Sequence, residues 1–266
     1  MKAVHAALVS VLCLAACGGD RNQRQRGDTS TAAGVLPPGA PEVRVTTVTG
    51  GGDVIQALPG PSALADSARP IIQRASGEQR AMLEMLGRNG PFSDKAAKIS
   101  GEFRGTFWDG GRTGDSVSAE AQFRTQDGAQ WRAAIDRVAP QDAPMEPHWG
   151  GVGTDVSYHG STGLGMPFVP MVRTAVSYYG TSKLYRNDVL VDSAAMSHVM
   201  LSTQTQGRAR SQDYAYKCWD CTQGPIEQLH LMLMPPKGKM YQVPGGIIHV
   251  MWQKSEGSTS SASRHQ

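Results

Sequence analysis

The sequence predicts a mainly β protein, an antiparallel β-sandwich or barrel of about nine short strands preceded by two short helices. Three observations predict this fold. From Gly101 onward, apolar and polar residues alternate with the period of two that is typical of half-buried strands. Glycine, aspartate and asparagine turn signals lie between or within the alternating runs. Before them, the segment Ser62–Arg88 spaces its apolar residues as helices do.

The clearest strand is Val117–Arg124, where Val117, Ala119, Ala121 and Phe123 alternate with polar residues. Asp109-Gly110-Gly111, Asp127-Gly128 and Asn187-Asp188 are typical turn sequences. The other expected strands are Phe103–Trp108, Gln130–Val138, Thr154–His159, Arg173–Tyr179, Lys183–Val191, Met196–Ser202, Glu227–Met234 and Gly246–Trp252.

The flanking segments differ in composition from this β domain, which we place at residues 101–254. Residues 17–61 are rich in Gly, Pro, Thr, Gln and Arg and indicate a flexible tether, within which Val43–Val48 could form a short strand. Residues 62–100 form the expected helical segment, interrupted by Pro70. Residues 255–266 are polar and serine-rich, which predicts a disordered tail.

The first 16 residues have the features of a secretory signal peptide. A basic start at Lys2 is followed by a mostly apolar run from Ala3 to Leu14, which is shorter than the roughly 20 residues of a membrane-spanning helix. The motif Leu14-Ala15-Ala16-Cys17 resembles the lipobox of bacterial lipoproteins. The resemblance covers only the first 17 residues, but residue types, order and distance from Met1 all fit. An ordinary secreted protein with Cys17 as a free thiol is the competing interpretation.

The resemblance implies that Cys17 carries lipid and that the mature chain is held at a membrane. Several acyl chains make such an anchor stable, because a single chain binds membranes only reversibly. In lipoproteins of this kind an aspartate after the cysteine tends to retain the protein in the inner membrane. Gly18 occupies that position here, so we expect an outer-membrane protein on the periplasmic side or the cell surface.

The last three expected strands share a His-x-Met pattern. Alternate residues of a strand lie on one face, so imidazole and thioether groups would share a face while apolar residues fill the other. Thioethers suit Cu(I), and imidazole binds Cu(I), Cu(II) or Zn(II). The pattern predicts a soft-metal site, with copper as the candidate ion, if the strands are adjacent. Its ligands would be His198, Met200, His230, Met232, Met234, His249 and Met251, with Met196 beginning the pattern.

The competing interpretation of the same pattern is packing. Methionine fills irregular cores well, and buried histidines are commonly hydrogen-bonded to the backbone. The strands also need not be neighbours.

Cys218 and Cys221 lie in a polar connection between two of the His-x-Met strands. A small structural disulfide is expected first, since exported proteins fold in an oxidising compartment. Thiol-disulfide exchange and a metal clip, in which His230 could join the two thiolates, are the alternatives. Thioredoxin-like surroundings are missing, and no second cysteine pair remains for a metal site once Cys13 leaves with the signal peptide and Cys17 carries lipid.

No catalytic motif stands out. Asp155, His159 and Ser161 lie close in sequence, but the Gly-x-Ser-x-Gly motif is absent, and Gly160–Gly165 lacks the ending of a phosphate loop. The net charge of +3 with scattered basic residues argues against nucleic acid. We therefore expect a non-enzymatic binding or structural domain. The alternative to metal binding is a metal-free interaction module for envelope proteins or glycans.

Overall fold

The computed structural model describes residues 42–59, 73, 95–111, 114–139, 151–158, 162, 172–205, 228–236 and 238–263. The described residues form nine strands. They are β1 (Glu42–Ala57), β2 (Ala96–Asp109), β3 (Ser116–Arg124), β4 (Gln130–Val138), β5 (Gly151–Tyr158), β6 (Val172–Arg186), β7 (Val189–Thr205), β8 (Gln228–Met234) and β9 (Ile248–Ser263).

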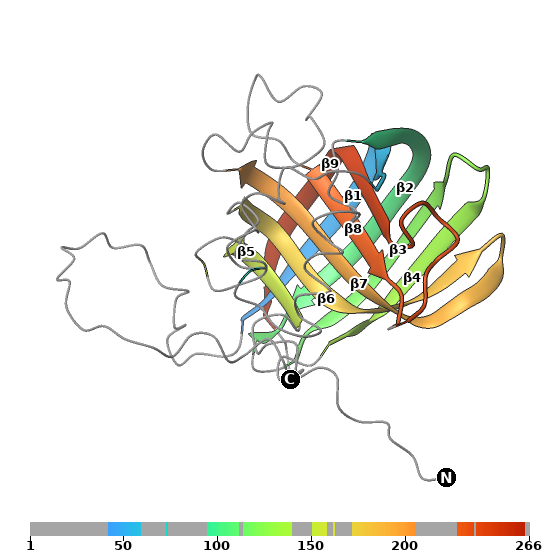
Figure 1. Ribbon diagram of the computed structural model, residues 1–266. Coiled ribbons are helices and arrows are strands. Elements are labelled where there is room, and N and C mark those ends of the chain that lie inside the picture. The colour runs from blue at the N-terminus through green and yellow to red at the C-terminus, as the bar shows by residue number, and fades with distance from the viewer. Residues whose placement is uncertain are drawn as a thin grey trace, which may run out of the picture.

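These strands form one antiparallel sheet in the order β4-β3-β2-β1-β9-β8-β7-β6-β5. An additional pairing between β4 and β6 closes the sheet into a barrel of eight strands, with β5 outside the ring (Figure 1). β1 and β9 lie side by side and pair along most of their length. Closure leaves the eight barrel strands with an inner face and an outer face, so the period of two in the sequence decides what fills the interior.

The barrel closes where β6 changes its neighbour. Val138 of β4 pairs with Gly180, and Gly151 of β5 pairs with the adjacent Tyr179. β4 and β5 therefore lie in succession along one edge of β6. The carboxylates of Asp109 and Asp115, at the two ends of the β2–β3 connection, accept hydrogen bonds from the backbone of β5 at Thr154 N (3.0 Å) and Val152 N (2.8 Å).

Aromatic side chains occupy the centre of the barrel. The rings of Phe103 and Phe107 lie 6.4 Å apart, and they contact Trp252 and Tyr178 at centroid distances of 5.6 and 5.7 Å. Buried aliphatic side chains of the strands opposite complete the core, namely Leu184, Val199, Leu201, Leu229, Leu231, Leu233, Ile248 and Val250. The interior is therefore a packed hydrophobic core among the described residues.

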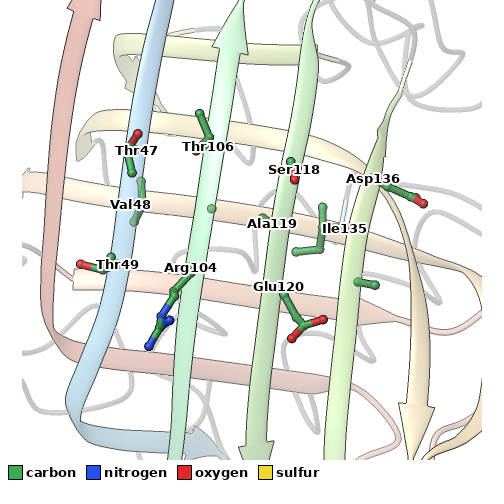
Figure 2. Close-up of a pocket in the computed structure, with 12 residues that line it drawn as sticks. Thr47, Val48, Thr49, Arg104, Thr106, Ser118, Ala119, Glu120, Ile135 and Asp136 are labelled. Carbon is green, nitrogen blue, oxygen red and sulfur yellow. The ribbon is translucent and has the colours of Figure 1, made fainter.

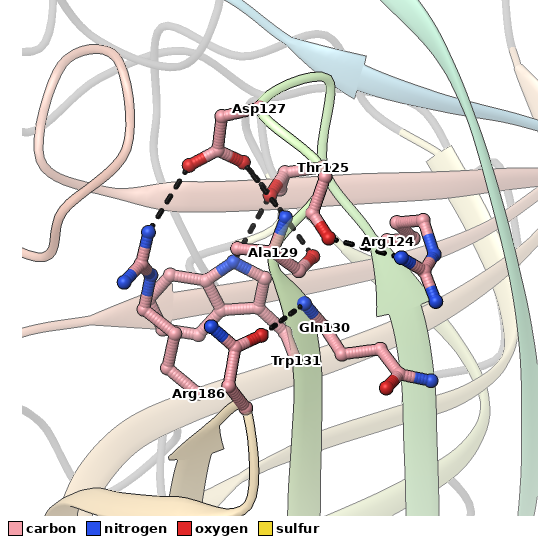
Figure 3. Close-up of polar contacts among 9 residues, drawn as sticks. Arg124, Thr125, Asp127, Ala129, Gln130, Trp131 and Arg186 are labelled. Atoms are coloured by element: carbon pink, nitrogen blue, oxygen red, sulfur yellow. Dashed lines mark hydrogen bonds and ion pairs between the residues drawn. The ribbon is translucent and has the colours of Figure 1, made fainter.

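The β3–β4 turn secures one end of this core through Thr125 (Figure 3). Its hydroxyl accepts a hydrogen bond from the buried Trp131 Nε1 at 3.1 Å and donates to Asp127 Oδ1 at 2.5 Å. Asp127 also accepts from Ala129 N and forms an ion pair of 3.2 Å with Arg186. The hydrogen bond from Thr125 is the largest of the contacts that lower the pKa of the Asp127 carboxyl.

The mainly β, antiparallel prediction is confirmed, and the architecture is a barrel. The expected strand Gln130–Val138 matches β4 at both ends. The expected strand Lys183–Val191 is wrong in extent, because it spans the turn between β6 and β7. Asn187 and Asp188 form that turn, with φ angles of 49° and 64° as in a type I′ hairpin.

Two flanking predictions are wrong. Residues 42–57, assigned to the tether, form the long strand β1, and residues 255–263, assigned to a disordered tail, continue strand β9. The short strand expected at Val43–Val48 lies within β1, but the glycines that follow it and the serines after residue 254 carry no strand pattern. The two segments pair with each other over the register that runs from Glu42 and Ser263 to Gly51 and Lys254, so a ladder of backbone hydrogen bonds orders both segments.

The helical prediction for residues 62–100 falls mostly outside the described residues. Gln73 is helical, and Ala96–Ser100 begin strand β2, so the predicted boundary at 100 is wrong. In the part of the chain that the structure describes, no helix has the length and apolar character needed to cross a bilayer.

We predict that Gly180→Ala destabilises the barrel by about 3 kcal/mol, because overpacking at a closed backbone contact forces strands apart. A Cβ atom at position 180 would collide with the carbonyl oxygen of Arg137 and the hydroxyl of Tyr178, which are themselves joined by a 2.6 Å hydrogen bond. Urea unfolding measures the change. The control is Gly51→Ala, where a Cβ atom meets nothing within 4 Å and stability should change by less than about 0.5 kcal/mol. Equal effects of the two substitutions would contradict the steric argument.

We also predict that Thr125→Val lowers the free energy of unfolding by about 1–3 kcal/mol, because it leaves the buried Trp131 Nε1 without its acceptor. Thr125→Ser keeps the hydroxyl and should retain most of the stability. Thermal and urea unfolding followed by tryptophan fluorescence test both variants. A Thr125→Val protein as stable as Thr125→Ser would show that this hydrogen bond is not needed.

Candidate functional site

The three His-x-Met strands are neighbours in the barrel. β7 pairs with β8, and β8 pairs with β9. Their inward faces carry apolar residues such as Val199, Leu231 and Val250, all fully buried in the core. The histidines and methionines consequently share the outer face. We call the six central side chains the His/Met patch, defined as His198, Met200, His230, Met232, His249 and Met251.

The register arranges the patch as two rows that run across the strands. In one row Met232 is the cross-strand partner of both His198 and His249. The other row consists of Met200, His230 and Met251. Imidazole and thioether therefore alternate along both rows, and every histidine has a methionine directly opposite on a neighbouring strand. Directly opposed side chains lie about 4.5–5.5 Å apart at Cβ, close enough to contact one another.

The patch is buried although it lies outside the barrel. The exposed fractions of His198, His230 and His249 are 6, 5 and 2%, and Met200, Met232 and Met251 are equally buried. Towards β1, Met251 packs with Ile55 and Ala57. The histidines therefore lie in a dry environment, where the cost of an unsatisfied or charged imidazole is high.

His230 and His249 are in direct contact. The distance from His230 Nδ1 to His249 Nε2 is 3.2 Å, and the ring centroids are 5.5 Å apart. At this distance the two nitrogens share a hydrogen bond, so one of them carries a proton and the other accepts it. Two ring nitrogens thus face each other inside an apolar patch.

His198 is held by the backbone of β6 and by aromatic rings. Its Nδ1 lies 3.0 Å from the carbonyl oxygen of Tyr178, which can only accept, so Nδ1 carries the proton and the lone pair is on Nε2. The imidazole stacks on Tyr179 at a centroid distance of 4.0 Å and lies 6.0 Å from Tyr158. Burial lowers the pKa of His198 to about 4, the hydrogen bond to Tyr178 opposes this shift, and the charge of His249 adds to it.

The contribution of Tyr158 and Tyr179 to the patch was not predicted from the sequence. The rings lie on β5 and β6 with their centroids 6.4 Å apart, and burial raises the pKa of the Tyr179 hydroxyl well above its usual value. Alternation along the strand predicts that Tyr179 lies on the face opposite to that of the core residue Tyr178. Only the strand register shows that Tyr179 is the cross-strand partner of His198.

No carboxylate completes the patch at the described neighbouring positions. The β6 residues paired with Met200 and His198 are Ser177 and Tyr179, and the β1 residue paired with Met251 is Ile55. Within the described ranges, no three His, Cys, Asp or Glu side chains are arranged to hold a metal ion. A metal site here would therefore need thioether ligands.

The remaining predicted site residues lie at the margin or beyond the described part. Met234 is half-buried on the same outer face, where it pairs with Met196 at the end of β8. Cys17, Cys218 and Cys221 lie outside the described residues, so lipidation, a disulfide, thiol exchange and a thiolate clip with His230 remain predictions.

A second feature is a shallow hollow of about 540 Å³ on the outer face of β1–β4. Figure 2 shows the hydroxyls of Thr47, Thr106 and Ser118 with Arg104 and Glu120 along it. Arg104 forms an exposed ion pair with Glu102, and Glu120 forms one with Arg132. Because it is open and its charges are paired, this hollow has weaker features of a binding site than the His/Met patch.

No protein-family model, curated protein or solved structure matches this chain. The candidate site therefore stands on its own geometry.

Proposed function

We propose that the chain is a lipid-anchored protein of the bacterial envelope whose barrel binds a soft metal ion, with copper as the candidate, through the His/Met patch. The observation that carries the metal proposal is the buried contact of 3.2 Å between His230 Nδ1 and His249 Nε2, surrounded by thioethers.

This nitrogen separation suits a shared metal ion. Two nitrogens bound to one tetrahedral ion at about 2.0–2.1 Å lie about 3.3 Å apart. An ion could therefore take the place of the shared proton at nearly the same nitrogen separation, while that proton moves to the other nitrogen of the ring that carried it, so both imidazoles stay neutral. The two states compete for the same lone pairs, so the hydrogen bond of the metal-free protein is compatible with a ligand pair.

His198 has the features of an oriented third ligand. Metal-binding histidines commonly donate their other ring N–H to a backbone carbonyl, which fixes the tautomer and the ring orientation. The Nδ1–H of His198 donates in this way to Tyr178, and the ring is stacked on Tyr179. Met232, between His198 and His249 in the register, is the thioether best placed to join them.

The lipid anchor adds a location to this function. An envelope protein is exposed to metal ions that enter from outside, and lipid on Cys17 would hold the barrel at the membrane. We propose the outer membrane, on its periplasmic side or at the cell surface, because Gly18 follows the cysteine.

A second candidate function is a metal-free interaction module for envelope proteins or glycans. It is favoured by the large apolar side chains that are exposed among the described residues, Val189, Leu190, Val191 and Met240. Three are consecutive at the start of β7. The fourth precedes Tyr241, whose hydroxyl donates a 2.8 Å hydrogen bond to Asp192 of β7. Apolar surface gathered at one end of a barrel is typical of a contact with another protein.

Copper binding gives the decisive prediction. Titration of the purified chain with Cu(I) against a chromogenic chelator should show one bound ion. The double variant His230→Gln and His249→Gln should bind it about 100-fold more weakly or worse, because both nitrogens are lost. Met240→Leu, a change at an exposed methionine away from the patch, is the control. Undetectable binding by the unmodified chain, or binding unchanged in the double variant, would reject the metal function and favour the interaction module.

Lipidation is tested by Cys17→Ser. The unmodified chain should be found in the membrane fraction, with an N-terminal peptide that carries acyl chains by mass spectrometry. The variant has no thiol to modify and should lose both properties, because protein without acyl chains has no anchor. An unmodified Cys17 in the mature protein would contradict the lipobox interpretation.

A further inference from the structure

We propose that the His/Met patch selects a soft monovalent cation, Cu(I) or its surrogate Ag(I), and rejects divalent ions such as Zn(II). This inference rests on the proposed metal function and adds the charge and class of the ion. It follows from three properties of the patch, which are the neutrality of its donors, its burial and the central position of Met232.

The donors of the patch are neutral. Imidazole and thioether bring no negative charge to a bound ion, unlike the thiolates and carboxylates that commonly bind Zn(II). The neighbouring side chains given by the register are Ser177, Tyr179 and Ile55, and none of them is a carboxylate. These three described neighbours therefore bring no negative charge that would offset a second positive charge on a bound ion.

Burial makes this lack of charge decisive. The cost of moving an ion from water into a medium of low polarity rises with the square of its charge, so a dication costs about four times as much as a monocation of the same size. The three histidines are at least nine-tenths buried, and Met251 is fully buried. The free energy of binding to neutral donors can offset the desolvation cost of a monocation far more readily than that of a dication.

Met232 is the ligand that distinguishes ions by softness. It is the cross-strand partner of His198 on one side and His249 on the other, so its sulfur is the donor common to both. A thioether binds Cu(I) and Ag(I) well and contributes little to Zn(II). Met232→Leu removes the sulfur at nearly constant volume, and such exchanges usually preserve a core.

The test compares three ions on the purified full chain without oxygen. Cu(I) is measured by competition with a chromogenic chelator, Ag(I) by its displacement of Cu(I), and Zn(II) by competition with a fluorescent zinc chelator. We expect one site for Cu(I) that Ag(I) can occupy, and an affinity for Zn(II) at least about 1,000-fold weaker, as expected for softness and charge acting together. Met232→Leu should weaken Cu(I) binding about 10-fold or more and leave Zn(II) binding unchanged, while Met240→Leu should alter neither.

X-ray absorption on the Cu(I)-loaded unmodified chain gives a measurement that does not depend on the stability of any variant. It should show sulfur as well as nitrogen around copper. If the affinity for Zn(II) equals that for Cu(I), or if no sulfur atom coordinates copper, the proposed selectivity is wrong although the protein still binds metal. Absence of binding by all three ions would reject the proposed function, and this inference with it.

Discussion

The closure of the sheet between β4 and β6 determines which side of every barrel strand faces inward, and the other features of the protein depend on it. A closed barrel must fill its interior with side chains of matching size. Here Phe103, Phe107, Tyr178 and Trp252 occupy that space together with leucines from β7 and β8. Closure requires β6 to change partner at Gly180, where no Cβ atom fits between Arg137 and Tyr178. One glycine thus permits the contact that makes the sheet a barrel.

The same alternation that fills the interior places the His/Met patch outside. Leu229, Leu231 and Leu233 point inward, so His230 and Met232 must point outward. Their burial there is unusual for polar groups on the outer face of a barrel. It is compensated by specific partners, with His198 bonded to the Tyr178 carbonyl and His230 to His249. A packing role would be met more simply by leucine, which is why this arrangement supports a ligand-binding proposal.

Local pattern predicted the strands whose two faces differ in polarity. β3 and β4 alternate cleanly, and their predicted bounds agree with the structure to within one residue. The short strand expected at Val43–Val48 covers only the first part of β1, and the second half of β9 was missed because its side chains are largely serines. The β1–β9 register shifts between Gly51 and Val54, where β1 carries one extra residue. A strand stabilised by its neighbour rather than by an apolar face leaves little signal in its own sequence.

The sequence by itself determined the β class, the spacing that puts imidazole and sulfur on one face of each of three strands, and the resemblance of its first 17 residues to a lipoprotein signal. Only the tertiary structure decided that these strands are adjacent, that Met232 lies between His198 and His249, and that the patch is buried. The physical reason is the range of the interactions. Alternation is a property of one extended chain, whereas register and burial depend on residues far apart in sequence, brought together when the barrel closes.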